Sequence, residues 1–250
     1  GGVKTAVMEM SAASGLPLLL PDELNPWITS TYGTGEMISD ALNRGCRKFL
    51  VGIGGSATND AGTGMLSALG VRFLDSRGQR LKGCGRDLES IARIDMSSLM
   101  PAARESEFIV ACDVNTPFCG PDGAARVFAP QKGADPQTAE ALDRGMRSFA
   151  RVIAGQFQTD IVPLSGAGAA GGLGGAFKAF LNARLTAGIE MVLDAIAFDS
   201  LLEGADLVIT GEGRIDAQTA AGKTAAGVLR RTERNPRHRH RRVCSDVPGA

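Results

Sequence analysis

Residues 48–64, KFLVGIGGSATNDAGTG, join a short apolar run to a loop of small and polar residues. The run KFLVGI is typical of a strand buried in a parallel sheet. After the loop, MLSAL predicts one or two helical turns that end at Gly70. A buried strand that leads through a glycine-bearing loop into a helix indicates an α/β fold.

The same order of strand, loop and helix continues on both sides of this stretch. Further strands are predicted where apolar residues run together or alternate, at 4–10, 71–75, 108–112 and 206–210. Helices are predicted at 34–45, 136–157, about 171–186 and from about 218. In the first helix, Thr34 is the expected N-cap and Gly45 the expected left-handed terminator.

Three of the predicted strands run directly into loops that carry glycine or aspartate. In open α/β sheets, ligands bind beyond the carboxyl ends of the strands. We therefore expect the chemistry to lie at residues 54–64, 113–132 and 211–223.

Charge and composition argue against several classes of protein. The formal net charge is zero, but residues 230–242 hold seven arginines and one glutamate, so the rest of the chain is mildly acidic. This acidic body and the aromatic content of 5% argue against nucleic-acid binding. The stretch at 164–183 is poor in charge but is mainly glycine and alanine, which argues against a membrane span.

The cysteines are widely spaced and include no C-x-x-C pair, which argues against a disulfide framework and a zinc ribbon. We expect free thiols in a reducing cytosol, and therefore a cytoplasmic protein. The five are Cys46, Cys84, Cys112, Cys119 and Cys244.

Two glycine-bearing segments could bind phosphate at the start of a helix. Residues 222–224, Gly-Lys-Thr, resemble the end of a Walker A motif, but Ala217 stands where that motif needs glycine. Residues 54–60 are better placed, because they follow a buried strand and open a helix whose unpaired N–H groups can hold an anion.

A third segment suggests a different function. Gly166, Gly168 and Gly171 match the dinucleotide-binding pattern G-x-G-x-x-G, so the alternative function is a dinucleotide-binding oxidoreductase. Pro163 in the preceding run is unfavourable for a central strand, and Glu190 opens a helical run instead of ending a second strand. Close packing of a helix of small residues also explains these glycines.

Taken together, five long segments resemble the bacterial glycerate kinase family, in the order in which that family has them. They are TYGTGE (31–36), GIGGSATNDAGTGM (52–65), ACDVNTPFCG with GAARVFAPQKGA (111–134), SGAGAAGGLGGAFKAFLNARLTAGIE (165–190) and DLVITGEGRIDAQTAAGK (206–223). The resemblance implies an ATP-dependent kinase that phosphorylates a hydroxyl of D-glycerate with Mg²⁺. It also implies a Rossmann- or flavodoxin-like parallel-sheet domain interrupted by a second α/β domain.

The resemblance predicts the domain boundaries, and the chain differs from the family pattern at both ends. The first domain would comprise 1–68 and 198–228, and the inserted α/β domain 69–197. Family members carry a further leading segment, so we expect a partial chain with weak or no kinase activity. Residues 229–250 depart from the family pattern, and we hypothesise an unstructured tail that arises from a frameshift, which resequencing of the DNA would test.

Phosphoryl transfer needs anion donors, cations, Mg²⁺ ligands and an acceptor for the hydroxyl proton. Asp216 is the favoured base because it shares a loop with Arg214, which can hold a carboxylate or phosphate. Asp60 and Asp113 remain candidates for the base or for Mg²⁺ ligands. The remaining candidates for binding glycerate or ATP are Gly54, Gly55, Ser56, Thr58, Asn59, Asn115, Lys132, Glu212 and Lys223.

Overall fold

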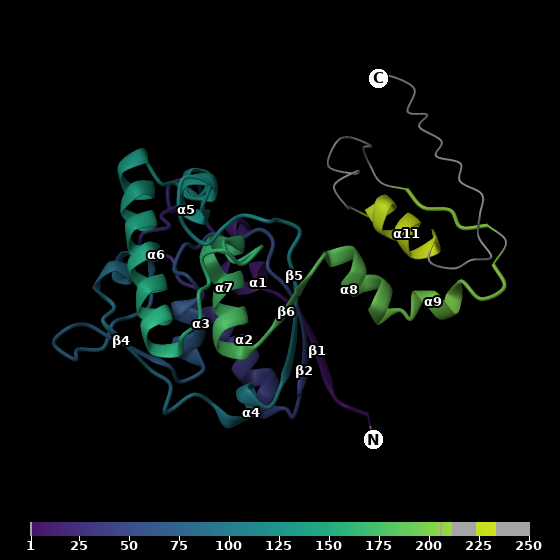
Figure 1. Ribbon diagram of the computed structural model, residues 1–250, viewed down its shortest axis with the longest axis horizontal. Coiled ribbons are helices and arrows are strands. Elements are labelled where there is room, and N and C mark those ends of the chain that lie inside the picture. Colours follow the sequence, from purple (N-terminus) through teal and green to yellow (C-terminus); the bar gives the residue numbers. More distant parts are fainter. Residues whose placement is uncertain (1, 206, 212–223, 234–250) are drawn as a thin grey trace. The chain divides into compact units, whose positions relative to one another are not determined.

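The computed structural model describes residues 2–205, 207–211 and 224–233 (Figure 1). Its strands are β1 (Thr5–Glu9), β2 (Lys48–Gly52), β3 (Arg72–Leu74), β4 (Arg93–Asp95), β5 (Glu107–Ala111) and β6 (Arg184–Thr186). Its longer helices are α2 (Tyr32–Asn43), α3 (Thr63–Ala68), α6 (Pro136–Phe157), α7 (Ala169–Leu181), α8 (Gly188–Ala195) and α11 (Thr224–Glu233). The remaining helical elements of the described residues are short: α1 (Ser11–Ser14), η1 (Leu16–Leu18), η2 (Gly85–Ser90), α4 (Pro101–Arg104), α5 (Ala124–Phe128), η3 (Pro130–Lys132) and α9 (Phe198–Leu201).

The central sheet has the strand order β1-β2-β5-β6, and its pairs β1–β2 and β2–β5 are parallel. The predicted parallel sheet is therefore present. Phe49 pairs with Phe108 across β2 and β5, and their rings stack at 4.7 Å between centroids. On this face, the ring of Phe177 from α7 lies 5.9 Å from that of Phe108. The apolar run that predicted β2 is thus buried by aromatic packing against a helix.

Helix α6 occupies the residues at which it was predicted, 136–157. Leu142, Met146, Phe149 and Ile153 form its buried face. The ring of Phe149 stacks on that of Phe180 from α7, and the two helices lie side by side (Figure 1).

The predicted helix at 34–45 begins earlier than expected, at Tyr32, and ends at Asn43. Thr34 is not its cap. It is buried inside the first turn, where its hydroxyl forms a 2.9 Å hydrogen bond with that of Ser14. Gly45 follows the helix with a φ of 86°, so the predicted left-handed terminator is confirmed.

Two other predictions need correction. The strand predicted at 206–210 is wrong for its described part, because residues 207–210 pair with no strand of the described chain and Leu207 and Ile209 are 76% and 86% exposed. An apolar run becomes a strand only where a neighbouring strand supplies hydrogen-bond partners. Helix α7 ends at Leu181, five residues before its predicted end, since Asn182 is left-handed and residues 184–186 form β6.

The chain is divided into two compact units, Gly1–Leu185 and Thr186–Ala250. The buried apolar cluster, which extends from Met10 to Ala183, belongs to the first unit. The second unit contains α8, α9 and α11, and Arg231 of α11 forms ion pairs there with Glu190, Asp194 and Asp199. The predicted domains, 1–68 with 198–228 and 69–197, stay a prediction. None of the described helices is both long and apolar enough to cross a membrane.

Candidate active site

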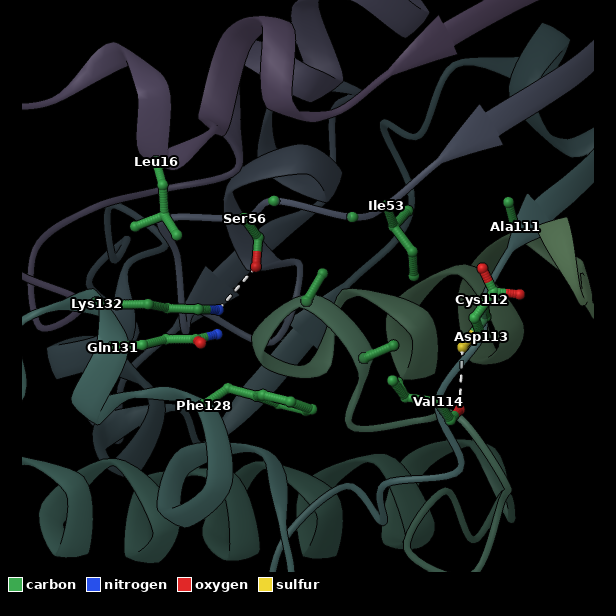
Figure 2. Close-up of a pocket in the computed structure, with 14 residues that line it drawn as sticks. Leu16, Ile53, Ser56, Ala111, Cys112, Asp113, Val114, Phe128, Gln131 and Lys132 are labelled. Atoms are coloured by element: carbon green, nitrogen blue, oxygen red, sulfur yellow. Dashed lines mark hydrogen bonds between the residues drawn. The ribbon is translucent and has the colours of Figure 1, made fainter. Parts of the chain in front are cut away.

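A cavity of about 220 Å³ lies at the carboxyl ends of the neighbouring strands β2 and β5 (Figure 2). Its polar wall comes from the loop after β2, from the loop after β5 and from η3. Two of the three loops in which chemistry was predicted therefore meet at one place. The lining residues are Leu16, Ile53, Gly54, Gly55, Ser56, Ala111, Cys112, Asp113, Val114, Phe128, Gln131, Lys132, Ala169 and Ala170.

Backbone hydrogen bonds hold the loop after β2 in place beside the cavity. The N–H of Leu16 donates to the carbonyl of Gly55, and the N–H of Ala57 donates to that of Ser14, each at 2.9 Å. Gly55 has a φ of 69°, a conformation in which a side chain is strained. The short turns α1 and η1 thus fix the shape of the loop that carries Ser56.

Lys132 is the charged side chain buried in the cavity wall, with an exposed fraction of 1%. Its Nζ donates to Ser56 Oγ and to the carbonyl oxygen of Thr58, both at 2.7 Å. Figure 2 shows the lysine and serine side chains pointing toward one another. Burial lowers the pKa of Lys132 to about 7, while the negative charge of Asp60 acts in the opposite direction.

Asp60 is fully buried but does not line the cavity. Its carboxylate accepts hydrogen bonds from the N–H groups of Thr31, Gly62 and Gly64 at 2.7, 3.0 and 3.2 Å. The Thr31 hydroxyl also donates to it, at 2.8 Å. Burial raises the pKa of Asp60, and these hydrogen bonds partly offset that effect. The carboxylate therefore joins α2 to the loop before α3.

Comparison with known proteins decides the family. The model of the glycerate kinase family matches residues 1–241. The chain belongs to the glycerate kinase family. The resemblance that the five segments indicated is thus confirmed.

Relatives within the glycerate kinase family extend well beyond this chain. A glycerate kinase from Halalkalibacterium halodurans is 49% identical over 230 residues, which make up 92% of this chain and 60% of that protein. Glycerate 2-kinase from Escherichia coli K12 is 45% identical over 228 residues, 91% of this chain and 60% of that protein. The chain therefore spans about 60% of the length of these curated relatives.

A solved structure supports the fold of the glycerate kinase family for this chain. The crystal structure described as that of a glycerate kinase 2 from Salmonella typhimurium LT2 superposes with a TM-score of 0.87 at 47% identity. The match covers 92% of this chain and 62% of the other. The predicted α/β fold is confirmed.

The candidate residues from the sequence fall into three groups in this glycerate kinase family member. Five line the cavity: Gly54, Gly55, Ser56, Asp113 and Lys132. Four described residues do not line it: Thr58, Asn59, Asp60 and Asn115. Four lie outside the described residues: Glu212, Arg214, Asp216 and Lys223.

The residues that do not line the cavity have other surroundings. Asn59 is buried, and its side-chain N–H donates to the sulfur of Met146 at 3.3 Å. Among the described residues, the Thr58 hydroxyl and the Asn59 amide oxygen have no hydrogen-bond partner. Asn115 is exposed and accepts a hydrogen bond from the hydroxyl of Ser165 at 2.8 Å.

The dinucleotide-binding alternative is not supported. No described strand leads directly into Gly166, because the element before it is α6, and the glycines approach the protein's own backbone. A Cβ on Gly168 would lie 2.1 Å from the carbonyl oxygen of Pro117, and one on Gly171 would lie 2.2 Å from that of Thr58. Contact between loops therefore explains these glycines, and the family matches are to glycerate kinases.

Several lining residues were not predicted from the sequence. Gln131 and Phe128 come from η3 and α5, and Cys112 follows β5. The Cys112 thiol donates to the carbonyl of Val114 at 3.3 Å, and burial raises its pKa. Gln131 directly precedes the predicted Lys132, and this position in the sequence could have identified it as a further candidate. The apolar residues of the wall carried no such signal.

The cavity can supply Mg²⁺ with one carboxylate ligand, and the other ligands would have to be water and substrate phosphates. Among the described residues, no three His, Cys, Asp or Glu side chains gather in a metal-binding group. Mg²⁺ commonly takes one or two carboxylates and completes its shell with water and substrate phosphates. Asp113 can supply one such carboxylate at the cavity, whereas Asp60 already accepts five hydrogen bonds elsewhere.

Proposed function

We propose that this chain binds D-glycerate and ATP and takes part in transfer of the γ-phosphate to a hydroxyl of glycerate. The observation that carries the proposal is the cavity at the ends of β2 and β5, where a glycine loop, Lys132 and Asp113 meet. Curated relatives with 45–49% identity include proteins named glycerate kinase and glycerate 2-kinase. The cavity brings together backbone N–H groups, a lysine and a carboxylate, which are among the groups that such a reaction uses.

The lining residues supply both anion recognition and charge neutralisation. The backbone of Gly54 and Gly55 and the hydroxyl of Ser56 would bind carboxylate or phosphate oxygens. Lys132 would add positive charge to the same wall. Asp113 would hold Mg²⁺, which neutralises the phosphate oxygens when bound.

Transfer forms an O–P bond to glycerate and breaks the bond between the γ-phosphorus and the bridging oxygen of ADP. The hydroxyl proton passes to a base, for which we propose Asp216, with Arg214 holding an anionic group beside it. Glu212 and Lys223, from the same stretch, are proposed ligand contacts. We propose that Asp60, in contrast, acts by positioning the loop before α3, through its bonds to Thr31 and Gly64.

Titration calorimetry of the chain with D-glycerate and with Mg²⁺–ATP tests the proposal. Binding is the first readout because the chain spans about 60% of its relatives' length. Turnover is then followed as glycerate-dependent release of ADP, which we expect to be weak. Binding of NAD(H) without binding of ATP or glycerate would overturn the proposal.

A matched pair of substitutions locates the metal-dependent step. Asp113→Asn should weaken Mg²⁺-dependent ATP binding by about ten-fold or more, because it removes the carboxylate at the cavity. Asp122→Asn, at an exposed position in the same loop, should leave the affinity unchanged. Equal effects of the two changes would exclude Asp113 from the Mg²⁺ site.

We also propose a cytoplasmic location, because ATP is the phosphoryl donor. Cys46, Cys84, Cys112 and Cys119 are free thiols, which suits a reducing compartment.

A further inference from the structure

The hydrogen bonds around Lys132 determine what the Ser56 hydroxyl can offer to a ligand. A protonated lysine has three donors and no acceptor, so Ser56 Oγ must accept the 2.7 Å hydrogen bond from Nζ. Ser56 is buried, and its hydroxyl makes no other hydrogen bond within the described part of the chain. Its own proton is therefore left to donate into the cavity that it lines.

Loss of the proton from Lys132 frees Ser56 Oγ from having to accept and permits the opposite arrangement. A neutral amine has two hydrogens and one lone pair. One hydrogen can stay on the Thr58 carbonyl at 2.7 Å, and the lone pair can accept the Ser56 proton. The serine oxygen then presents only lone pairs to the cavity, which repel an anionic oxygen.

We propose that Lys132 is a positioning residue that fixes the direction of the Ser56 hydroxyl proton while it is protonated, so that this wall binds an anionic oxygen more tightly in that state than after Lys132 loses its proton. The ligand class is a carboxylate or a phosphate. Its identity as glycerate or ATP rests on the proposed function. The residue that touches the ligand is Ser56, and Lys132 acts through it.

The groups around Lys132 place its titration near neutral pH. Burial lowers its pKa to about 7, and Asp60, in the loop after β2, opposes this change. The other titratable groups that line the cavity are Cys112 and Asp113 after β5. Burial raises the pKa of the Cys112 thiol, so that thiol stays neutral in this range.

Calorimetry of the whole chain between pH 6 and pH 8 tests the proposal, with D-glycerate, Mg²⁺–ATP and sulfate as separate ligands. For a pKa of about 7, the protonated fraction of Lys132 falls from about nine-tenths to about one-tenth over this range. Affinity should therefore fall roughly ten-fold for the ligand that contacts Ser56. Sulfate and glycerate do not change protonation state between pH 6 and pH 8. ATP does, but its own titration affects the wild type and Ser56→Ala equally, so comparison of the two proteins corrects for it.

Ser56→Ala is the decisive variant because it removes the switching hydroxyl and only one buried oxygen. Its affinity should be lower than that of the wild type at pH 6, and the fall between pH 6 and pH 8 should be smaller, because only the direct attraction of the Lys132 charge still titrates. Ser76→Ala, at an exposed turn, should keep the wild-type pH dependence. Lys132→Met should lose the pH dependence, and Ser56→Ala decides the question if Lys132→Met does not fold.

The possible outcomes separate this inference from the proposed function. Glycerate binding with no pH dependence, or with the same dependence in Ser56→Ala, would overturn the inference and leave the function standing. Sulfate binding with the expected profile, but no binding of glycerate or ATP, would support the inference and overturn the function. Absence of binding by every anion would overturn both.

Discussion

Gly171 lies where a side chain would clash with the backbone of the loop beside the cavity. Its φ is 66°, and a Cβ there would lie 2.2 Å from the carbonyl oxygen of Thr58 and 2.6 Å from Cα of Asn59. Both the backbone conformation and the contact oppose a side chain. We expect Gly171→Ala to lower the free energy of unfolding by about 2–4 kcal/mol in urea denaturation.

Gly155 provides the matched control for Gly171. It lies in α6 with a negative φ and nothing within 4 Å of its Cβ position. Gly155→Ala should therefore raise the free energy of unfolding by about 0.5–1 kcal/mol, since alanine favours a helix. A destabilisation by Gly171→Ala no larger than a few tenths of a kcal/mol would contradict the role of close loop contact.

Single residues also show where prediction of the site from sequence reached its limit. Residue type and position after a strand identified Ser56, Asp113 and Lys132 as candidates, and all three line the cavity. Asp60 met the same criteria, yet its carboxylate accepts hydrogen bonds from Thr31, the residue that precedes α2. The position of Thr31 depends on tertiary packing, which the spacing of polar residues does not encode.

At the scale of elements, Asp143 joins α6 to the loop that follows β5. It is buried, and its Oδ1 accepts from the N–H of Gly120 at 2.7 Å. Its Oδ2 accepts from Nε of Arg147 at 2.9 Å. We expect Asp143→Ala to lower the free energy of unfolding by about 2–4 kcal/mol, because it leaves a buried N–H without a partner.

A neighbouring acid on the same helix controls for the loss of a charge. Glu140 is exposed and forms a 3.8 Å ion pair with Arg144 one turn away. Glu140→Ala should change the free energy of unfolding by less than about 0.5 kcal/mol. Similar values for the two variants in the same chemical denaturation would show that the link from Asp143 to Gly120 does not stabilise the loop.

The same scale shows which parts of the fold could be predicted from the sequence. The bounds of α6 were right because Leu142, Met146, Phe149 and Ile153 recur at helical spacing and Asp135 caps the first turn. Strands β2 and β5 were found from continuous apolar runs. Residues 206–210 have such a run too, but pairing with another strand is a tertiary property that composition does not report.

At the scale of the whole molecule, the apolar core and the cavity are both formed by the same part of the sequence. The buried apolar cluster ends at Ala183, and every residue lining the cavity lies between Leu16 and Ala170. The first unit, Gly1–Leu185, thus contains both. In contrast, Arg214 and Asp216, which we propose as ligand contact and base, come after Leu185 in the sequence.

We therefore expect a chain of residues 1–185 to unfold cooperatively and to bind sulfate within about three-fold of the 250-residue chain, but to lose D-glycerate affinity. The chain's single tryptophan, Trp27, lies in the first unit, so its fluorescence during urea unfolding reports on this part. Calorimetry measures both ligands. Retention of glycerate affinity would show that the second unit contributes no contact to that ligand. Loss of the cooperative transition would show that the apolar cluster needs the second unit in order to fold.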